Sequence, residues 1–275
     1  LRLATERVAA VVQPRAVAVQ ELLHLHRALE STAGVICVSG PAGIGKSRLV
    51  HRALQQFFTP TTKPDVGLTI CDAAHSKDLH RFCLALGGAL GVGARHSEPT
   101  QALSARIGKR LAQSSRQVLV LDHLDGLRQE LPPLLRFWGQ TAPHCTFITV
   151  ATRPLHVDTA IDLRLGALAV PPKAGRAILL RYPAVRIFSD RAQAASPFFD
   201  AEAHVFLGAE LCRRLGGHPW AIEVAACLMD RLAPERLLER LPARSDEDAS
   251  LSQTAHHTAH WIWELLLPWE KEALV

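Results

Sequence analysis

Short apolar runs alternate with longer amphipathic stretches over about the first 165 residues of the chain. Five runs are apolar almost throughout, at residues 35–39, 66–71, 118–121, 145–150 and 161–165. Such runs are typical of parallel strands that are covered on both faces. Between them, residues 46–58, 79–90 and 100–113 have the apolar spacing of helices. The alternation predicts an α/β fold with an open parallel sheet, which binds ligands at the carboxyl ends of its strands.

The pattern changes after Pro171 and Pro172, and no run of similar strand quality follows. Helical spacing recurs at residues 184–194, 201–215, 219–230 and 234–240. Gly216 and Gly217 suit the end of one helix, and Pro219 suits the first turn of the next. A polar stretch, 242–252, resembles a linker, and residues 257–267 and 268–275 predict two more helices. We therefore expect a helical region after the sheet.

Composition narrows the class of protein only modestly. The formal net charge is +5 over 275 residues, and the arginines are scattered, which favours a solvated surface over a nucleic-acid stripe. No apolar run approaches the roughly 18 residues that span a membrane, so we expect no membrane contact. Six widely spaced cysteines predict a reducing, cytoplasmic location. Because the chain begins with Leu1, we interpret it as a piece of a longer protein.

The strongest chemical signal is the segment GPAGIGKS at residues 40–47, here called the phosphate loop. It fits the pattern G-x-x-x-x-G-K-[ST] and lies between a predicted strand and a predicted helix, as that motif requires. Glycines let successive backbone N–H groups face inward, and the helix start adds its positive dipole end. We expect nucleotide phosphates to be held by residues Gly40, Pro41, Ala42, Gly43, Ile44, Gly45, Lys46, Ser47 and Arg48. Lys46 supplies a cation to the β- and γ-phosphates, and the Ser47 hydroxyl is a ligand for Mg²⁺.

An acid follows the third apolar run directly. Asp122 at the end of a buried strand is placed as P-loop proteins place the carboxylate that holds the magnesium shell. Many ATPases have a second acid immediately afterwards, whereas this chain has His123. Asp125 is the nearest following carboxylate, and it could either orient the attacking water or cap the turn at Gly126. The absence of an acid at position 123 predicts slow turnover. Asp72, after the second run, is interpreted as a turn residue.

A second cation is expected at the same sheet edge. The apolar run at residues 145–150 continues into Thr152 and Arg153. The planar guanidinium of Arg153 suits a γ-phosphate oxygen, and the alternative is a surface arginine that precedes Pro154.

Taken together, these segments resemble the STAND family of signal-transducing ATPases, and within it the ATPase modules of bacterial transcriptional regulators of the antibiotic-regulatory and LuxR-like types. The resemblance is carried by GPAGIGKS, VLVLDHLD, the strand that ends in ATRP, and RRLGGHPWAIEVAA. The stretch HTAHWIWELLLPWEKEAL is similar to the start of the family's winged-helix domain. The order of these motifs covers nearly the whole chain.

The resemblance implies a P-loop sheet domain at 1–170, a helical domain at 171–244, and a linker with the start of a winged helix at 245–275. It implies ATP or ADP with Mg²⁺ as ligands, Ser47 and Asp122 at the metal, Asp122 and Arg153 as catalytic residues, and Pro219 lining the nucleotide pocket. Asp125 is a third candidate catalytic residue, from its position after Asp122 and not from the resemblance. It further implies a switch that self-associates on activation by an inducer and reaches DNA only through domains outside this chain. One departure is that residues 13–17, near the expected adenine site, lack the family's glycine and acid.

Three functions remain open from the sequence. The first is a slowly hydrolysing switch in a larger bacterial transcriptional regulator. The second is a continuously cycling ATPase, such as a loader or remodeller, which would need an efficient base. The third is an interaction module that holds nucleotide without hydrolysing it.

Overall fold

The computed structural model describes residues 19–31, 34–58, 65–93, 97–173 and 175–241. The chain forms two compact units. The first contains the described parts of residues 17–40 and 46–165, and the second contains residues 41–45 and the described parts of 166–275. The predicted winged-helix start at 245–275 and the departure at residues 13–17 lie outside the described residues.

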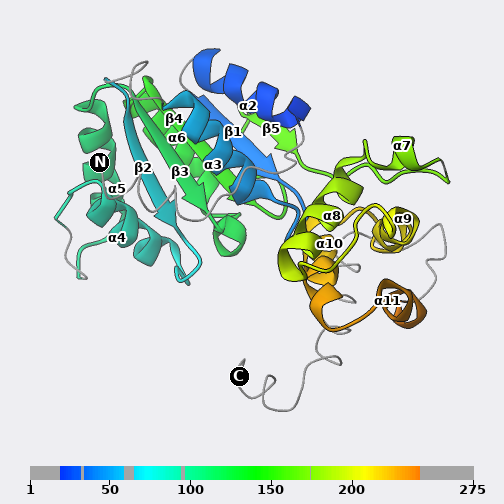
Figure 1. The fold of residues 1–275 in the computed structure, drawn as a ribbon. Coiled ribbons are helices and arrows are strands. Elements are labelled where there is room, and N and C mark those ends of the chain that lie inside the picture. The colour runs from blue at the N-terminus through cyan, green and yellow to red at the C-terminus, as the bar shows by residue number, and fades with distance from the viewer. Residues whose placement is uncertain (1–18, 32–33, 59–64, 94–96, 174, 242–275) are drawn as a thin grey trace. The chain divides into compact units, whose positions relative to one another are not determined.

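The first unit is built around a five-stranded sheet in the order β2-β3-β4-β1-β5, in which every neighbouring pair is parallel (Figure 1). The predicted parallel sheet is confirmed, and each strand lies within one residue of its predicted bounds. The strands are β1 (Gly34–Ser39), β2 (Gly67–Asp72), β3 (Gln117–Asp122), β4 (Cys145–Ala151) and β5 (Ile161–Arg164).

Helices connect the first four strands in turn, as crossovers between parallel strands require, and a further helix precedes β1. They are α2 (Val19–Ser31), α3 (Lys46–Phe57), α4 (Leu79–Ala89), α5 (Thr100–Ala112), the 3₁₀ turn η1 (Leu124–Leu127) and α6 (Leu131–Thr141). Capping side chains and prolines determine where several of these helices begin. The Asp78 side chain caps α4 by accepting a hydrogen bond from the Arg81 N–H at 2.8 Å. Prolines occupy the first turn of α6, where no intrahelical N–H is needed.

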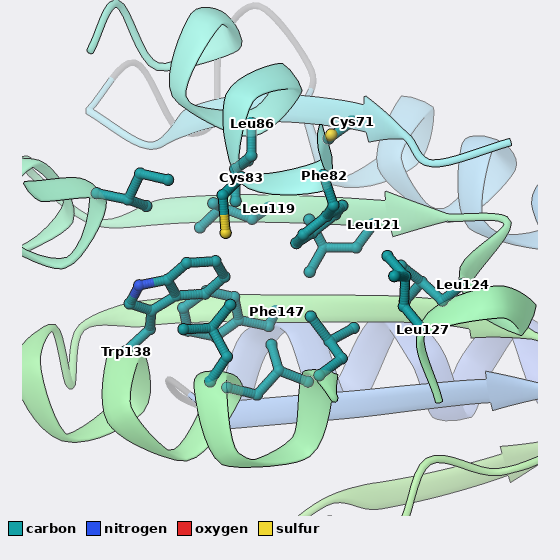
Figure 2. Packing of buried hydrophobic residues seen from close by; sticks show 14 of the residues in the cluster. Cys71, Phe82, Cys83, Leu86, Leu119, Leu121, Leu124, Leu127, Trp138 and Phe147 are labelled. Atoms are coloured by element: carbon teal, nitrogen blue, oxygen red, sulfur yellow. The ribbon is translucent and has the colours of Figure 1, made fainter. Parts of the chain in front are cut away.

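Alternate residues of each strand point to opposite faces of the sheet. On one face, side chains from β3 and β4 meet α4, η1 and α6 in a continuous apolar core (Figure 2). Trp138 in this core is fully buried and stacked on Phe147 with ring centroids 6.3 Å apart, and its indole N–H donates to the Ser104 carbonyl at 3.0 Å. This core fixes the sheet whose edge carries the candidate site.

The second unit is helical, and no strand follows β5 among the described residues. Its elements are α7 (Arg176–Leu179), α8 (Pro183–Ala195), α9 (Val205–Arg214), α10 (Pro219–Cys227), the 3₁₀ turn η2 (Leu228–Asp230) and α11 (Pro234–Arg240). They share one apolar core, to which α8 contributes Phe188 and α10 contributes Ile222. None of the described helices has the length and apolar character needed to cross a membrane.

One predicted helix bound in this unit is wrong. The helix predicted from residue 201 begins at Val205, because the Asp200 carboxylate accepts hydrogen bonds from the N–H groups of Glu202 and Ala203. That local turn competes with helix formation. The helical stretch predicted to reach residue 230 does so: α10 ends at Cys227 and continues as the 3₁₀ turn η2 to Asp230.

The turn between α9 and α10 requires glycine. Gly216 and Gly217 have φ values of 59° and 69°, in the left-handed region, and the Gly217 N–H donates to the Cys212 carbonyl at 3.0 Å. The Gly217 carbonyl accepts from the Leu168 N–H at 2.9 Å. A Cβ atom at Gly217 would lie 2.1 Å from the Leu168 carbonyl oxygen, so a side chain cannot fit without displacing backbone.

Replacing Gly217 by alanine is therefore expected to destabilise the protein by about 2–5 kcal/mol, from backbone strain together with the steric clash. Urea unfolding followed by circular dichroism measures the change. The control is Gly139→Ala inside α6, where a Cβ meets nothing within 4 Å and helix propensity favours alanine. A Gly217→Ala protein as stable as its parent would contradict this account of the turn.

Candidate nucleotide-phosphate site

The phosphate loop leaves β1 at Ser39 and enters α3 at Lys46. Gly43 and Gly45 have φ values of 73° and 100°, which side-chain-bearing residues rarely adopt. A tight turn at the loop's tip is marked by a hydrogen bond from the Ile44 N–H to the Pro41 carbonyl at 3.4 Å. Left-handed glycines followed by a helix start form the kind of N–H concavity that binds anions.

Lys46 lies beside the acids that the sequence singled out. Its ammonium donates to the Gly40 carbonyl at 2.8 Å. Burial lowers the pKa of Lys46, and the nearby carboxylates of Asp125 and Asp122 act in the opposite direction. The structure therefore brings Lys46, Asp122 and Asp125 close enough for the two carboxylates to affect the pKa of the lysine. An ammonium has three donor hydrogens, so one lysine can bond both its own loop and a phosphate.

Asp122 is the last residue of β3 and is 8% exposed. One of its carboxylate oxygens accepts the backbone N–H of His123 at 2.8 Å. Ser47, in the first turn of α3, is half-buried, and the neighbouring Arg48 is exposed. A hydroxyl and one carboxylate suit Mg²⁺, which commonly keeps several waters and binds one or two protein groups together with substrate phosphates.

His123 forms a contact that the sequence analysis missed. It is the one non-glycine residue with positive φ, at 57°, in the part of the chain that the structure describes. In this conformation its Nδ1 lies 2.9 Å from a carboxylate oxygen of Asp72, at the end of β2. Burial of Asp72 opposes ionisation, but hydrogen bonds from the Ala74 N–H and from His123 bring the pKa of Asp72 below its ordinary value. Parallel pairing of Asp72 with Asp122 creates the contact.

Asp125 holds the segment that follows β4. Its Oδ1 accepts hydrogen bonds from the Thr152 backbone N–H at 2.7 Å and from the Thr152 hydroxyl at 2.5 Å. Neither of the two roles weighed from the sequence, water orientation or capping at Gly126, includes this contact. Arg153 follows directly and is exposed. Asp125 thus fixes the backbone from which the predicted γ-phosphate sensor projects.

Pro219 is buried at the first position of α10, in the second unit. Proline has no N–H to donate. The residue of this turn that makes a hydrogen bond to the phosphate loop is its neighbour His218, whose Nε2 lies 2.9 Å from the Ala42 carbonyl oxygen. Residues 41–45 belong to the same compact unit as α10. The sequence analysis assigned a role to the proline and did not predict this contact of the histidine.

A cavity of about 460 Å³ lies away from this site. It is lined by residues at the amino ends of β1 and β4, including Gly34 and Cys145, and by Arg136 and Asp158, which form an ion pair at 2.7 Å. In an open parallel sheet the ligand-binding edge is at the carboxyl ends. The cavity is therefore at the opposite edge from the phosphate loop.

The sheet order, the loop and the acid that ends β3 give the fold of the P-loop NTPases. Consistent with this fold, residues 27–153 match a family model described as an AAA domain.

An uncharacterised protein of Mycobacterium tuberculosis is 30% identical over 220 residues, which are 79% of this chain and 51% of that protein. A second protein of the same species, whose name proposes an HTH-type transcriptional regulator, is 26% identical over 217 residues, covering 78% of this chain and 22% of its own length. The chain thus spans about half the length of the first relative.

Among solved structures, the ORC2 protein of Aeropyrum pernix has a TM-score of 0.55 and 16% identity, covering 83% of this chain and 68% of that one. At this identity the likeness concerns the fold.

The contact between Asp125 and Thr152 is expected to stabilise the first unit. Asp125→Asn and Thr152→Val each remove part of it, and we expect a coupling energy of about 0.5–1.5 kcal/mol in a double-mutant cycle, at the low end because Asp125 is exposed. Thermal and urea unfolding of the four proteins measure it. Strictly additive effects would show that the two side chains do not interact in solution.

Proposed function

We propose that this chain binds ATP and ADP with Mg²⁺ at the phosphate loop. The observation that carries the proposal is a loop whose glycines adopt left-handed conformations and which ends at Lys46, within electrostatic range of Asp125 and Asp122. Backbone N–H groups of residues 43–47 hold the phosphate oxygens, and Lys46 supplies the compensating charge. Arg48, exposed in the first turn of α3, adds positive charge near the same helix start.

Ser47 and Asp122 are proposed to hold the metal. When bound, Mg²⁺ offsets the negative charge of the β- and γ-phosphates. Among the described residues, no group of three or more His, Cys, Asp or Glu side chains is arranged to hold a metal ion without other ligands. A site of two protein ligands completed by phosphate oxygens and water is consistent with that arrangement.

The proposal extends to a slowly hydrolysing switch within a larger bacterial transcriptional regulator. Support comes from the order of STAND-like motifs and from the mycobacterial relative whose name proposes a transcriptional regulator, of which this chain covers 22%. In this proposal Arg153 distinguishes ATP from ADP, and Pro219 lies at the nucleotide pocket. An unknown inducer promotes self-association, domains outside the chain contact DNA, and the protein works in the cytoplasm.

The contacts around the metal acid favour slow turnover over continuous cycling. Position 123 carries a histidine that is hydrogen-bonded to Asp72, and Asp125 accepts two hydrogen bonds from Thr152. Both bonds from Thr152 end on Oδ1 of Asp125, so water activation by this carboxylate would fall to Oδ2 alone. The same contacts favour, as the second candidate, a module that holds nucleotide without hydrolysing it. Steady-state and single-turnover hydrolysis assays separate these functions from a cycling ATPase.

Lys46→Ala is expected to weaken ATP and ADP binding by about 10- to 100-fold or more, because it removes a charge-assisted contact to the phosphates. Isothermal titration calorimetry measures the affinity, and circular dichroism checks that the protein is folded. Lys109→Ala is the matched control, since Lys109 is an exposed lysine in the last turn of α5. Unchanged affinity in folded Lys46→Ala protein would refute the phosphate site.

Arg153→Ala tests the switch. A ligand shifts a two-state protein only by its difference in affinity for the two states. One charge-assisted contact to the γ-phosphate is worth about 1.5–3 kcal/mol, which changes populations about 10- to 100-fold. We expect the variant to keep its ADP affinity and to lose the difference between ADP- and ATP-bound hydrogen exchange across residues 184–230.

The parent protein is the reference for that measurement. It is measured in the full-length regulator, with and without inducer. Identical exchange of the parent in ADP and ATP under all these conditions would exclude the switch and favour the module that holds nucleotide without hydrolysis.

A further inference from the structure

His218 occupies an unusual position in the second unit. It follows the two left-handed glycines after α9, and it is the N-cap residue of α10. Its side chain is fully buried, at 0% exposure. Histidines are rarely buried to this degree, and a buried imidazole needs hydrogen-bond partners for its ring nitrogens.

The partners of His218 define its protonation state. The backbone N–H of Ala221 can only donate, and its nitrogen lies 3.4 Å from Nδ1. The carbonyl oxygen of Ala42 can only accept, and it lies 2.9 Å from Nε2. The ring therefore satisfies both contacts only as the neutral tautomer that carries its hydrogen on Nε2. One nitrogen caps α10 and the other binds the phosphate loop.

The hydrogen bond from His218 to the Ala42 carbonyl constrains the orientation of the peptide group that joins Ala42 to Gly43. In a trans peptide the carbonyl of Ala42 and the N–H of Gly43 point in opposite directions within one plane. Holding that carbonyl on the His218 side therefore turns the Gly43 N–H away from His218. The N–H groups of the loop are the groups that face bound phosphate in this motif.

Close packing reinforces the constraint. A Cβ atom added to Gly43 would lie 2.9 Å from His218 Cε1 and 2.9 Å from Trp220 Cβ. The rings of His218 and Trp220 are nearly perpendicular, with centroids 6.5 Å apart. The loop tip is thus held against α10 by a hydrogen bond and by direct contact.

We propose that His218 is a positioning residue for the phosphate loop: through the Ala42 carbonyl it presets the direction of the Gly43 N–H, and it links phosphate binding to the start of α10. This inference rests on the proposed nucleotide function, because its ligand is the polyphosphate of ADP or ATP. A purely structural histidine would cap α10 without affecting phosphate affinity.

Two substitutions separate the roles of the two ring nitrogens of His218. In His218→Asn the side-chain oxygen takes the place of Nδ1, so the cap on α10 is kept and the donor to Ala42 is lost. In His218→Gln the amide nitrogen takes the place of Nε2, so the donor is kept and the cap is lost. Both side chains are smaller than imidazole and polar, which makes each variant the control for the other.

ADP affinity is measured by calorimetry, stability by thermal unfolding, and loop order by hydrogen exchange of residues 43–45 in the ligand-free protein. The Asn variant is expected to bind ADP about 3- to 10-fold more weakly and to exchange faster in the loop, with a melting temperature near that of the parent. The Gln variant is expected to bind ADP within about twofold of the parent and to melt about 2–4 °C lower.

Parent-like ADP affinity and loop exchange in the Asn variant would overturn the proposal. Parallel losses of affinity and stability in both variants would also overturn it, because they would indicate a structural role alone. Failure of the proposed function has a different signature: the parent itself would bind ADP no better than Lys46→Ala. The ligand-free exchange of the loop tests His218 even in that case.

Discussion

The candidate site depends on one constraint, the common direction of all five strands. Because every pair is parallel, the carboxyl ends of β1, β2, β3 and β4 lie along one edge of the sheet. The phosphate loop and the Thr152 segment follow the ends of β1 and β4, and Asp72 and Asp122 are the last residues of β2 and β3. Apolar packing on both faces makes this arrangement rigid, and the core around Trp138 and Phe147 carries much of that packing on one face (Figure 2). A charged group at such an edge is placed by the register of its strand.

At this edge, hydrogen bonds join the segments at the ends of neighbouring strands, and these bonds fix the positions of the charged side chains. His123 bridges from the end of β3 to Asp72 after β2, and Asp125 bridges from η1 to Thr152 after β4. Lys46 lies near Asp122 and Asp125. In the proposed function these contacts pre-arrange a cation and the acid proposed to bind Mg²⁺, and they engage His123 and the Oδ1 atom of Asp125. The proposed nucleotide binding and the proposed slow hydrolysis both rest on this geometry.

The sequence predicted features that depend on local pattern. Continuous apolar runs were enough to predict the five strands. A glycine pattern between a strand and a helix was enough to predict the phosphate loop at residues 40–47. Asp122 followed from its place at a strand end. What the sequence could not predict depends on residues that are distant along the chain. His123 meets Asp72 across 51 residues, Asp125 meets Thr152 across 27, and His218 meets Ala42 across 176.

Local chemistry explains the misplaced helix start as well. Asp200 diverts the backbone that helical periodicity alone assigned to α9. One signal for His218 was present in the sequence: a histidine between two glycines and a proline stands where a helix cap is expected. The pattern indicates a cap, but its second partner appears only in three dimensions.

The central claim is that backbone N–H groups of the phosphate loop hold a polyphosphate. Hydrogen exchange of the amides of residues 43–47, compared at saturating AMP and saturating ADP with Mg²⁺, tests it most directly. AMP carries the same base and sugar but lacks the β-phosphate. The account predicts that ADP slows the exchange of these amides by about tenfold or more relative to AMP, because a charge-assisted contact must break before exchange occurs. Equal exchange with the two nucleotides would contradict it.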